Sequence, residues 1–279
     1  MEISVACSNA AFYPKLKEIR YCGIDMPFAS YTQRETILAD AYTDTVLDGY
    51  HLLCEAGLRL CQTHLSYLPT HLPPFGDGSY QAYEDYMLPI YRKEIELTGR
   101  MNCGVAVMHP YYEADREKSR EGNIALISKL LPVLEENHVI LSLENIFGNR
   151  YSDIYLSNAE DMLFYTDYFQ SPYVGVCLDT GHAIIRKEDP IEMLKKIGEK
   201  LTAVHLHTTV PTIDLHAIPY CTGYGERIGW KELAQELEKL PYQGTFNMEI
   251  RPPSKFTDQA AKTYYQLAYD VAKGILEQE

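Results

Sequence analysis

The hydrophobic pattern along the chain alternates between two kinds of segment. Short, nearly continuous apolar runs recur at fairly regular intervals, which is typical of strands buried on both faces of a parallel sheet. The predicted strands are residues 3–8, 23–28, 58–65, 104–109, 139–146, 174–179, 203–208 and 245–250. Segments with apolar residues at helical spacing fill most of the gaps, at residues 14–19, 39–56, 80–97, 116–136, 158–169, 190–197, 230–240 and 257–276. The pattern therefore predicts repeated β–α units.

Strands that alternate with helices predict a parallel sheet, and eight such units in 279 residues predict a closed (β/α)8 TIM barrel. An open doubly wound sheet is the alternative architecture. We expect a single domain over residues 1–279, because the Pro/Gly-rich stretch at 69–78 is more simply a long loop after the third strand than a linker. Pro89 and Pro132 lie inside predicted helices and should kink or split them.

Composition and charge exclude several classes of protein. Charged residues make up 23% of the chain and hydrophobic residues 46%, which is ordinary for a globular protein and excludes disorder of the whole chain. The 25 basic and 39 acidic residues give a net charge of −14, so a phosphate backbone is repelled and nucleic acid is not expected as a partner. No apolar stretch approaches about 20 residues, so no membrane-spanning helix is expected.

The cysteines and the start of the chain favour a cytoplasmic location. The seven cysteines are scattered, form no CxxC pair and lie partly inside apolar runs, as expected of free thiols in a reducing compartment. The first two residues, Met-Glu, offer no basic start for a signal peptide. Four tyrosines in one helical region, Tyr80, Tyr83, Tyr86 and Tyr91, fit either core packing or a subunit contact, so a homo-oligomer stays open.

Polar side chains of the types that bind metals recur where the predicted strands end. In a barrel these carboxyl ends meet at one mouth, where barrel enzymes build their active sites. The residues concerned are His64, His109, Glu144, Asp179, His182, His205, His207, Asp214, His216 and Glu249, with Asp214 and His216 placed in the loop after the seventh strand. A single histidine at a strand end is more often an ordinary hydrogen-bonded residue than a ligand, so the carboxylates carry more weight.

Three of these carboxylates lie within or directly after apolar runs. Glu144 falls in VILSLENI, Glu249 falls in FNMEI, and Asp179 follows VGVCL. An unpaired carboxylate buried in a barrel costs several kcal/mol, and one divalent cation would compensate all three. With His205 they form a mostly oxygen ligand set, which suits Mn²⁺, Mg²⁺ or Co²⁺, while the many histidines also allow Zn²⁺. His207 lies two residues further along, and we expect His205 to be the ligand.

The ordered set of motifs resembles the xylose isomerase-like barrel superfamily, which includes sugar-phosphate isomerases and epimerases, ketose 3-epimerases and endonuclease IV. The motifs are LSLEN at 141–145, CLDTGHA at 177–183, VHLH at 204–207 followed by DLH at 214–216, GYGERIGW at 223–230, and MEIR at 248–251. The resemblance covers nearly the whole chain. It implies a TIM barrel with a metal centre in its mouth.

The resemblance also implies roles for individual residues. In ketose epimerases of the superfamily one metal is bound by a Glu, an Asp, a His and a final Glu, which match Glu144, Asp179, His205 and Glu249. The two glutamates also serve there as acid and base, and the histidine that matches His182 contacts the substrate. The endonuclease IV group uses a larger ligand set, and its further positions match His64, His109, His182, Asp214 and His216.

The favoured interpretation is a divalent-metal-dependent sugar isomerase or epimerase that removes a proton next to a carbonyl and forms an enediolate. Its partner would be a small sugar-like molecule, contacted by His182, His109, His64 and Arg251. An endonuclease IV-like phosphodiester hydrolase is one alternative, against which the charge of −14 and the lack of Lys/Arg-rich loops argue. A keto-sugar lyase that uses the same carbanion is another, and a sensor barrel without catalysis is a third.

Overall fold

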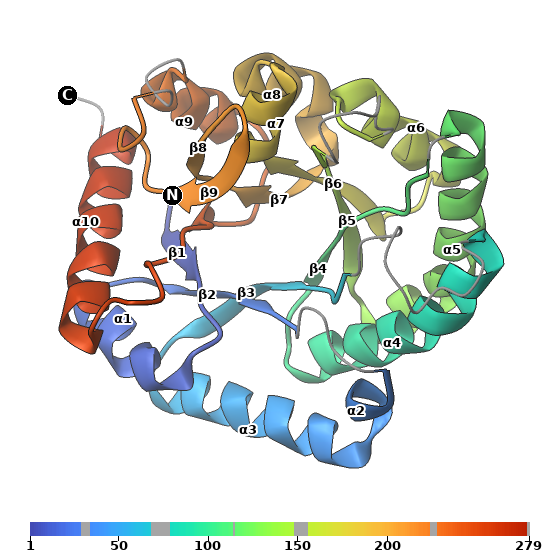
Figure 1. The fold of residues 1–279 in the computed structure, drawn as a ribbon, viewed down its shortest axis with the longest axis horizontal. Coiled ribbons are helices and arrows are strands. Elements are labelled where there is room, and N and C mark those ends of the chain that lie inside the picture. Colours follow the sequence, from blue (N-terminus) through green and yellow to red (C-terminus); the bar gives the residue numbers. More distant parts are fainter. Residues whose placement is uncertain (29–33, 68–78, 114, 148–155, 224–227, 278–279) are drawn as a thin grey trace.

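Eight parallel strands form a closed barrel that is surrounded by helices (Figure 1). The computed structural model describes residues 1–28, 34–67, 79–113, 115–147, 156–223 and 228–277. The barrel strands are β1 (Ile3–Ala6), β2 (Gly23–Pro27), β3 (Arg59–His64), β4 (Val105–Met108), β5 (Ile140–Glu144), β6 (Val174–Asp179), β7 (Leu201–His205) and β10 (Phe246–Met248). Each lies within or overlaps a predicted strand, so the predicted (β/α)8 TIM barrel is confirmed.

The sheet closes into a barrel between the two strands at the ends of its spatial order, β7 and β10. The strand order is β10-β1-β2-β3-β4-β5-β6-β7, and every neighbouring pair is parallel. Leu206, just after β7, bridges to Met248 of β10, and its backbone N–H donates to the carbonyl of Asn247 over 2.9 Å. Closure brings the carboxyl ends of all eight strands around one mouth.

The helices follow the strands and pack on the outside of the barrel (Figure 1). They are α1 (Tyr13–Ile19), α2 (Arg34–Leu38), α3 (Asp40–Glu55), α4 (Tyr80–Arg100), α5 (Arg116–Asn137), α6 (Ala159–Phe169), α7 (Thr180–Arg186), α8 (Pro190–Ile197), α9 (Trp230–Lys239) and α10 (Asp258–Leu276). Short 3-10 turns at Ala10–Phe12 and Gly198–Lys200 precede α1 and follow α8. Among the described residues, no helix is both long and apolar enough to cross a membrane.

Side-chain caps fix where several helices begin. The capping oxygens accept hydrogen bonds from backbone N–H groups of the first helical turn, which would otherwise lack partners. The caps of α4, α5, α6, α8 and α10 are Ser79, Asp115, Asn158, Asp189 and Thr257. The tyrosines of α4 pack into the core. Tyr83 and Tyr91 are buried in it, and the partly buried Tyr80 and Tyr86 pack against it.

Neither internal proline splits its helix. Pro89 lies inside α4 and Pro132 inside α5, and both helices continue past the proline. Of the two expected outcomes the split is therefore wrong, and the kink stays a prediction. The residues that follow, Ile90 and Val133, are buried, and the two helices pack against each other. Burial of apolar side chains on both sides of the proline compensates the lost backbone hydrogen bond.

An additional hairpin follows β7 and was not predicted. Its strands β8 (Thr208–Val210) and β9 (Ile213–Ala217) pair antiparallel and pack against α7. Asp214 and His216 therefore lie on a strand, not in the loop where the sequence placed them. Side chains alternate along β9, so that Ile213 and Leu215 are exposed while Asp214 is half-buried and His216 is buried.

Candidate metal centre and active site

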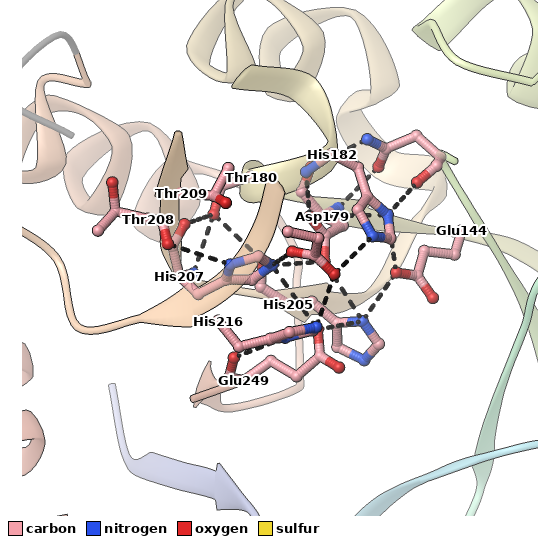
Figure 2. Close-up of polar contacts among 12 residues, drawn as sticks. Glu144, Asp179, Thr180, His182, His205, His207, Thr208, Thr209, His216 and Glu249 are labelled. Atoms are coloured by element: carbon pink, nitrogen blue, oxygen red, sulfur yellow. Dashed lines mark hydrogen bonds and ion pairs between the residues drawn. The ribbon is translucent and has the colours of Figure 1, made fainter. Parts of the chain in front are cut away.

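Four side chains converge in the mouth of the barrel (Figure 2). They are the last residues of β5, β6 and β7 and the residue after β10, namely Glu144, Asp179, His205 and Glu249. All four are buried. Each offers a ligand atom within 4.8 Å of those of the other three. The structure thus brings together the residues that the sequence assigned to one metal.

One nitrogen of His205 faces all three carboxylates. Nδ1 of His205 lies 3.1 Å from Oε1 of Glu144 and 3.3 Å from Oε2 of Glu249. The distance from Nδ1 to Oδ2 of Asp179 is 3.8 Å. Parallel pairing of β6 with β7 sets Asp179 directly beside His205. A cation among these atoms would meet three carboxylates and one imidazole, a set that suits Mn²⁺, Mg²⁺, Co²⁺ or Zn²⁺.

One ligand atom of this cluster lacks a hydrogen-bond partner among the described residues. Oε2 of Glu249 is buried, and no group in the described part of the chain donates a hydrogen bond to it. A buried carboxylate oxygen without a donor is costly unless a cation or a water completes its environment. Its position beside Nδ1 of His205, within the four-residue cluster, therefore fits a bound divalent cation.

A second cluster shares Glu144 with the first. Oε2 of Glu144 lies 3.1 Å from Nε2 of His64 and 3.2 Å from Nε2 of His109. The two imidazole rings meet edge to face, with centroids 4.8 Å apart. The other oxygen of Glu144 belongs to the four-residue cluster, so this carboxylate could bridge two ions.

A third cluster is built by the hairpin. His207, at the end of the VHLH motif, joins Asp214 and His216 of β9. Nε2 of His216 lies 2.7 Å from Oδ2 of Asp214, and the rings of His207 and His216 stack at 4.5 Å. Nε2 of His207 also lies 3.0 Å from Oδ2 of Asp179, which connects this cluster to the first (Figure 2).

The DTGH stretch positions several of these groups at once. Asp179 ends β6 and caps α7, since its Oδ1 accepts the backbone N–H of His182 over 2.6 Å. The hydroxyl of Thr180 donates to the carbonyl of His207 over 2.8 Å. A Cβ at Gly181 would lie only 1.9 Å from Cε1 of His207, so the glycine leaves the space that this ring occupies.

Asn145 fixes the neighbouring strand ends to each other. Its Nδ2 donates to the carbonyl of Asp179 over 2.9 Å, and its Oδ1 accepts the backbone N–H of Asp179 over 2.7 Å. The carbonyl of Asn145 lies 2.8 Å from Nδ1 of His182. Nδ1 of His182 is thereby placed as a donor, which leaves Nε2 for Asp214 at 3.7 Å or for a ligand.

The charges of the first two clusters depend on one another. Burial alone would raise the pKa of Glu144, but the imidazoles of His205 and His109 outweigh it and hold that pKa well below its usual range. Burial also raises the pKa of Glu249, but His205 lowers it by more, so this pKa ends well below its usual range. Both glutamates are therefore ionised at neutral pH.

Two histidines beside Asp214, His182 and His216, have pKa values that shift in the opposite direction. Burial lowers the pKa of His182, but Asp179 and Asp214 outweigh burial and raise this pKa to about 10. Burial also lowers the pKa of His216, whereas Glu249 and Asp214 raise it to about 10. Without a cation these imidazoles carry the positive charge that balances the carboxylates.

A cavity of about 970 Å³ lies over the clusters. Glu144 and Glu249 form part of its wall, whereas Asp179 and His205 lie behind the wall. The residues expected to contact substrate all line it, namely His64, His109, His182 and Arg251. Arg251 is the only lysine or arginine among the described residues of the wall. Aromatic side chains supply much of the remainder, including Phe28, Tyr67, Tyr112 and Phe147.

Some site residues were missed or given too little weight. His207 was set aside in favour of His205, although the two-residue spacing places both side chains on one face of the strand. Asn145 and Asp25 were given no role. The signal for Asp25 was its place in the apolar run at 23–28, which resembles the setting of Glu144. Part of the GYGERIGW motif, residues 224–227, lies outside the described residues.

Comparisons with known proteins agree with the fold. Over 138 residues the chain is 28% identical to a D-psicose 3-epimerase of Enterocloster bolteae. The matched segment covers 48% of this chain and 41% of that protein. The chain spans about half the length of the curated relatives it matches.

Two solved structures share the fold. A D-psicose 3-epimerase crystallised in the presence of D-fructose superimposes with a TM-score of 0.75 at 13% identity, covering 99% of both chains. The apo form of a 3-keto-D-glucoside 4-epimerase from E. coli gives a TM-score of 0.74 at 16% identity, covering 98% of this chain and 99% of the other. The profile of the xylose isomerase-like TIM barrel family matches residues 15–267, and the chain belongs to that family.

Proposed function

We propose that the protein is a divalent-metal-dependent sugar isomerase or epimerase. The observation that carries the proposal is the placement of Glu144 and Glu249. Both belong to the four-residue cluster, and both also line the cavity, whereas Asp179 and His205 lie behind it. Two carboxylates that border both a cation and a substrate can exchange protons with that substrate. The relatives named above support a sugar as the substrate, because each of them is an epimerase of a sugar.

The chemistry follows from these positions. A divalent cation held by Glu144, Asp179, His205 and Glu249 would polarise a substrate carbonyl as a Lewis acid. One of the two cavity-facing glutamates removes the proton next to that carbonyl, which gives an enediolate. The other glutamate takes up a proton from solvent and delivers it to the opposite face of that carbon or to the neighbouring carbon, while the first glutamate releases its proton to solvent. Both carboxylates start ionised, since the imidazoles around them hold their pKa values low.

The remaining wall residues bind and orient the substrate in this proposal. His182 has Nδ1 engaged by the Asn145 carbonyl, so its Nε2 is available to a hydroxyl group. His64 and His109 lie on the same wall beside Glu144. Arg251 lies at the rim, with its side chain 61% exposed and 3.6 Å from Oε1 of Glu249, where it could pair with an anionic substituent.

Proton exchange with solvent tests this proposal. The metal-loaded protein is incubated in D₂O with a panel of ketoses, keto acids and abasic DNA. We expect deuterium at carbon in a ketose, and we expect Glu144→Gln and Glu249→Gln each to abolish it. Glu238→Gln, which changes an exposed glutamate of α9, is the matched control and should exchange normally. Near-normal exchange in either active-site variant would contradict the two-carboxylate mechanism, and release of a leaving group together with exchange would indicate a lyase.

A second candidate function is metal-dependent phosphodiester hydrolysis. The observation that favours it is the presence of the two further clusters, because two or three ions can clamp the attacking and leaving oxygens of a phosphodiester. The charge of −14 and the single arginine on the described cavity wall argue against a nucleic-acid substrate. Metal analysis separates the two functions: one ion per chain supports the epimerase, whereas three ions together with nicking of abasic DNA support the hydrolase.

A further inference from the structure

A buried acid, Asp25, lies next to His205 and borders the cavity, and it has no part in the chemistry described above. Asp25 is on β2, and its exposed fraction is only 2%. Within the described ranges its ion-pair partner is a histidine, with no lysine or arginine within reach. A buried carboxylate is costly unless it is well paired, so the contacts of Asp25 bear on its role.

Hydrogen bonds hold Asp25 in one orientation. Nε2 of Gln62 donates to Oδ2 of Asp25 over 3.2 Å, and Nδ2 of Asn247 donates to the same oxygen over 3.3 Å. Asn247 is fixed in turn by Ser4, whose hydroxyl donates to Oδ1 of Asn247 over 2.8 Å. All four residues are buried in the barrel interior. Together they restrict rotation of the Asp25 carboxylate.

The same oxygen of Asp25 faces the ring of His205. Nε2 of His205 lies 3.2 Å from Oδ2 of Asp25, while Nδ1, across the ring, faces Glu144 and Glu249. Nε2 is buried and has no hydrogen-bond partner of good geometry in the described part of the chain, and Asp25 is its only acidic neighbour there. In a neutral imidazole one nitrogen carries the hydrogen and the other is free to bind a metal, so the neighbour of one nitrogen decides the role of the other.

We propose that Asp25 is a positioning residue of the metal centre. It accepts the Nε2 hydrogen of His205, which leaves Nδ1 as the metal ligand and fixes the ring toward Glu144 and Glu249. Partners of this kind orient a ligating histidine and strengthen it as a donor, and their loss weakens metal binding about 10- to 100-fold. This inference rests on the metal centre of the proposed function, but it assigns a role that the four ligands alone do not reveal.

Metal affinity tests the inference without any assay of activity. The dissociation constant for Zn²⁺ is measured by competition with a chelator for the wild-type chain, Asp25→Asn and Asp161→Asn. Asp161→Asn is the matched control, because it likewise turns a buried carboxylate into an amide, on α6, where its partner is Arg116 and not His205. We expect Asp25→Asn to raise the dissociation constant about 10-fold or more, and Asp161→Asn to leave it nearly unchanged. A dissociation constant for Asp25→Asn equal to that of the wild type would overturn the inference.

A second measurement uses only the wild-type protein, so it does not depend on how the variant folds. Nitrogen NMR of histidine-labelled, Zn²⁺-loaded protein reports which ring nitrogen binds metal and which carries hydrogen. We expect His205 to bind through Nδ1 and to be protonated at Nε2. Binding through Nε2 would overturn the inference while leaving the proposed function intact. If no ring nitrogen of the wild type responds to Zn²⁺, the metal centre itself is refuted and the inference falls with it.

Discussion

At the scale of single residues, the site depends on close approaches that leave no spare room. His207 occupies the space where a side chain at position 181 would begin, and its Nε2 lies 3.0 Å from Oδ2 of Asp179. Gly181 sits in α7, where alanine would ordinarily be favoured over glycine. Glycine at this helical position is therefore explained by the imidazole ring packed against it.

Gly181→Ala should displace the ring of His207 and disturb Asp179 with it. A misplacement of about 1 Å can cost about 100-fold in rate, so we expect a loss of that order in the rate of deuterium exchange. Gly274→Ala in α10 is the matched control, because nothing lies within 4 Å of the added Cβ. The control should keep its exchange rate and gain a few tenths to about 1 kcal/mol in unfolding free energy. Normal exchange in Gly181→Ala would show that the position of His207 does not matter.

The residue scale also shows what a sequence can predict about a site. Glu144, Asp179 and Glu249 could be predicted as a cluster, because each is a carboxylate set in or directly after an apolar run and every strand of a barrel ends at the same mouth. Asn145 and Asp25 could not be given their roles in this way. Their significance comes from partners on other strands, and only the register of the strands shows which atoms meet.

At the scale of elements, the β8–β9 hairpin escaped prediction because its pattern is inverted. On β9 the apolar side chains Ile213 and Leu215 point outward, while Asp214 and His216 point toward the site. Strand prediction relies on apolar residues facing the core, so a strand that turns polar ligands inward looks like a loop. The barrel strands, which are apolar on both faces, were correspondingly easy to recognise.

A second feature at this scale is the link between α4 and the end of β3. Glu94 of α4 is fully buried, and its carboxylate accepts the backbone N–H of Ser66 over 2.8 Å and the Ser66 hydroxyl over 2.5 Å. These bonds attach the segment after His64 to the helix. Burial raises the pKa of Glu94 to about 8, although the bonds from Ser66 partly oppose the shift.

This raised pKa should make stability depend on pH. In the unfolded chain the carboxyl titrates near 4.5, so between about pH 4.5 and 8 the folded state binds more protons than the unfolded state. The unfolding free energy should therefore fall across this range, by up to about 1.4 kcal/mol per pH unit, and level off above it. Glu94→Gln should flatten the curve, whereas Glu96→Gln, an exposed glutamate of the same helix, should not. Denaturant unfolding of the metal-free protein at several pH values measures this, and an unchanged slope in Glu94→Gln would refute it.

At the scale of the whole molecule, closure of the barrel turns distant residues into one site. Glu144 and Glu249 lie 105 residues apart in the sequence. The pairing of β5 with β6 and of β6 with β7, together with the bridge from the end of β7 to β10, brings them to the same ring nitrogen. This arrangement could be predicted because eight apolar runs alternate with helices, which few folds accommodate. The number of ions could not be predicted, since it depends on side-chain distances between clusters.

The balance of charge in the mouth gives a further prediction. Burial would lower the pKa of His205, but Glu249 and Glu144 outweigh it and raise this pKa well above its usual range. A protonated imidazole must lose a proton before it can bind a metal, so metal binding should release at least one proton and tighten as pH rises. Calorimetry in buffers of different ionisation enthalpy measures the release. A binding enthalpy that is the same in every buffer would contradict it.

The central claim is that one divalent cation is held jointly by Glu144, Asp179, His205 and Glu249. Anomalous diffraction from crystals of the Mn²⁺-loaded protein, collected on both sides of the metal absorption edge, tests it most directly. We expect a strong anomalous peak among the side chains of these four residues, with or without weaker peaks at the two neighbouring clusters. A metal-loaded crystal with no peak among the four, or with its metal bound elsewhere, would contradict the account.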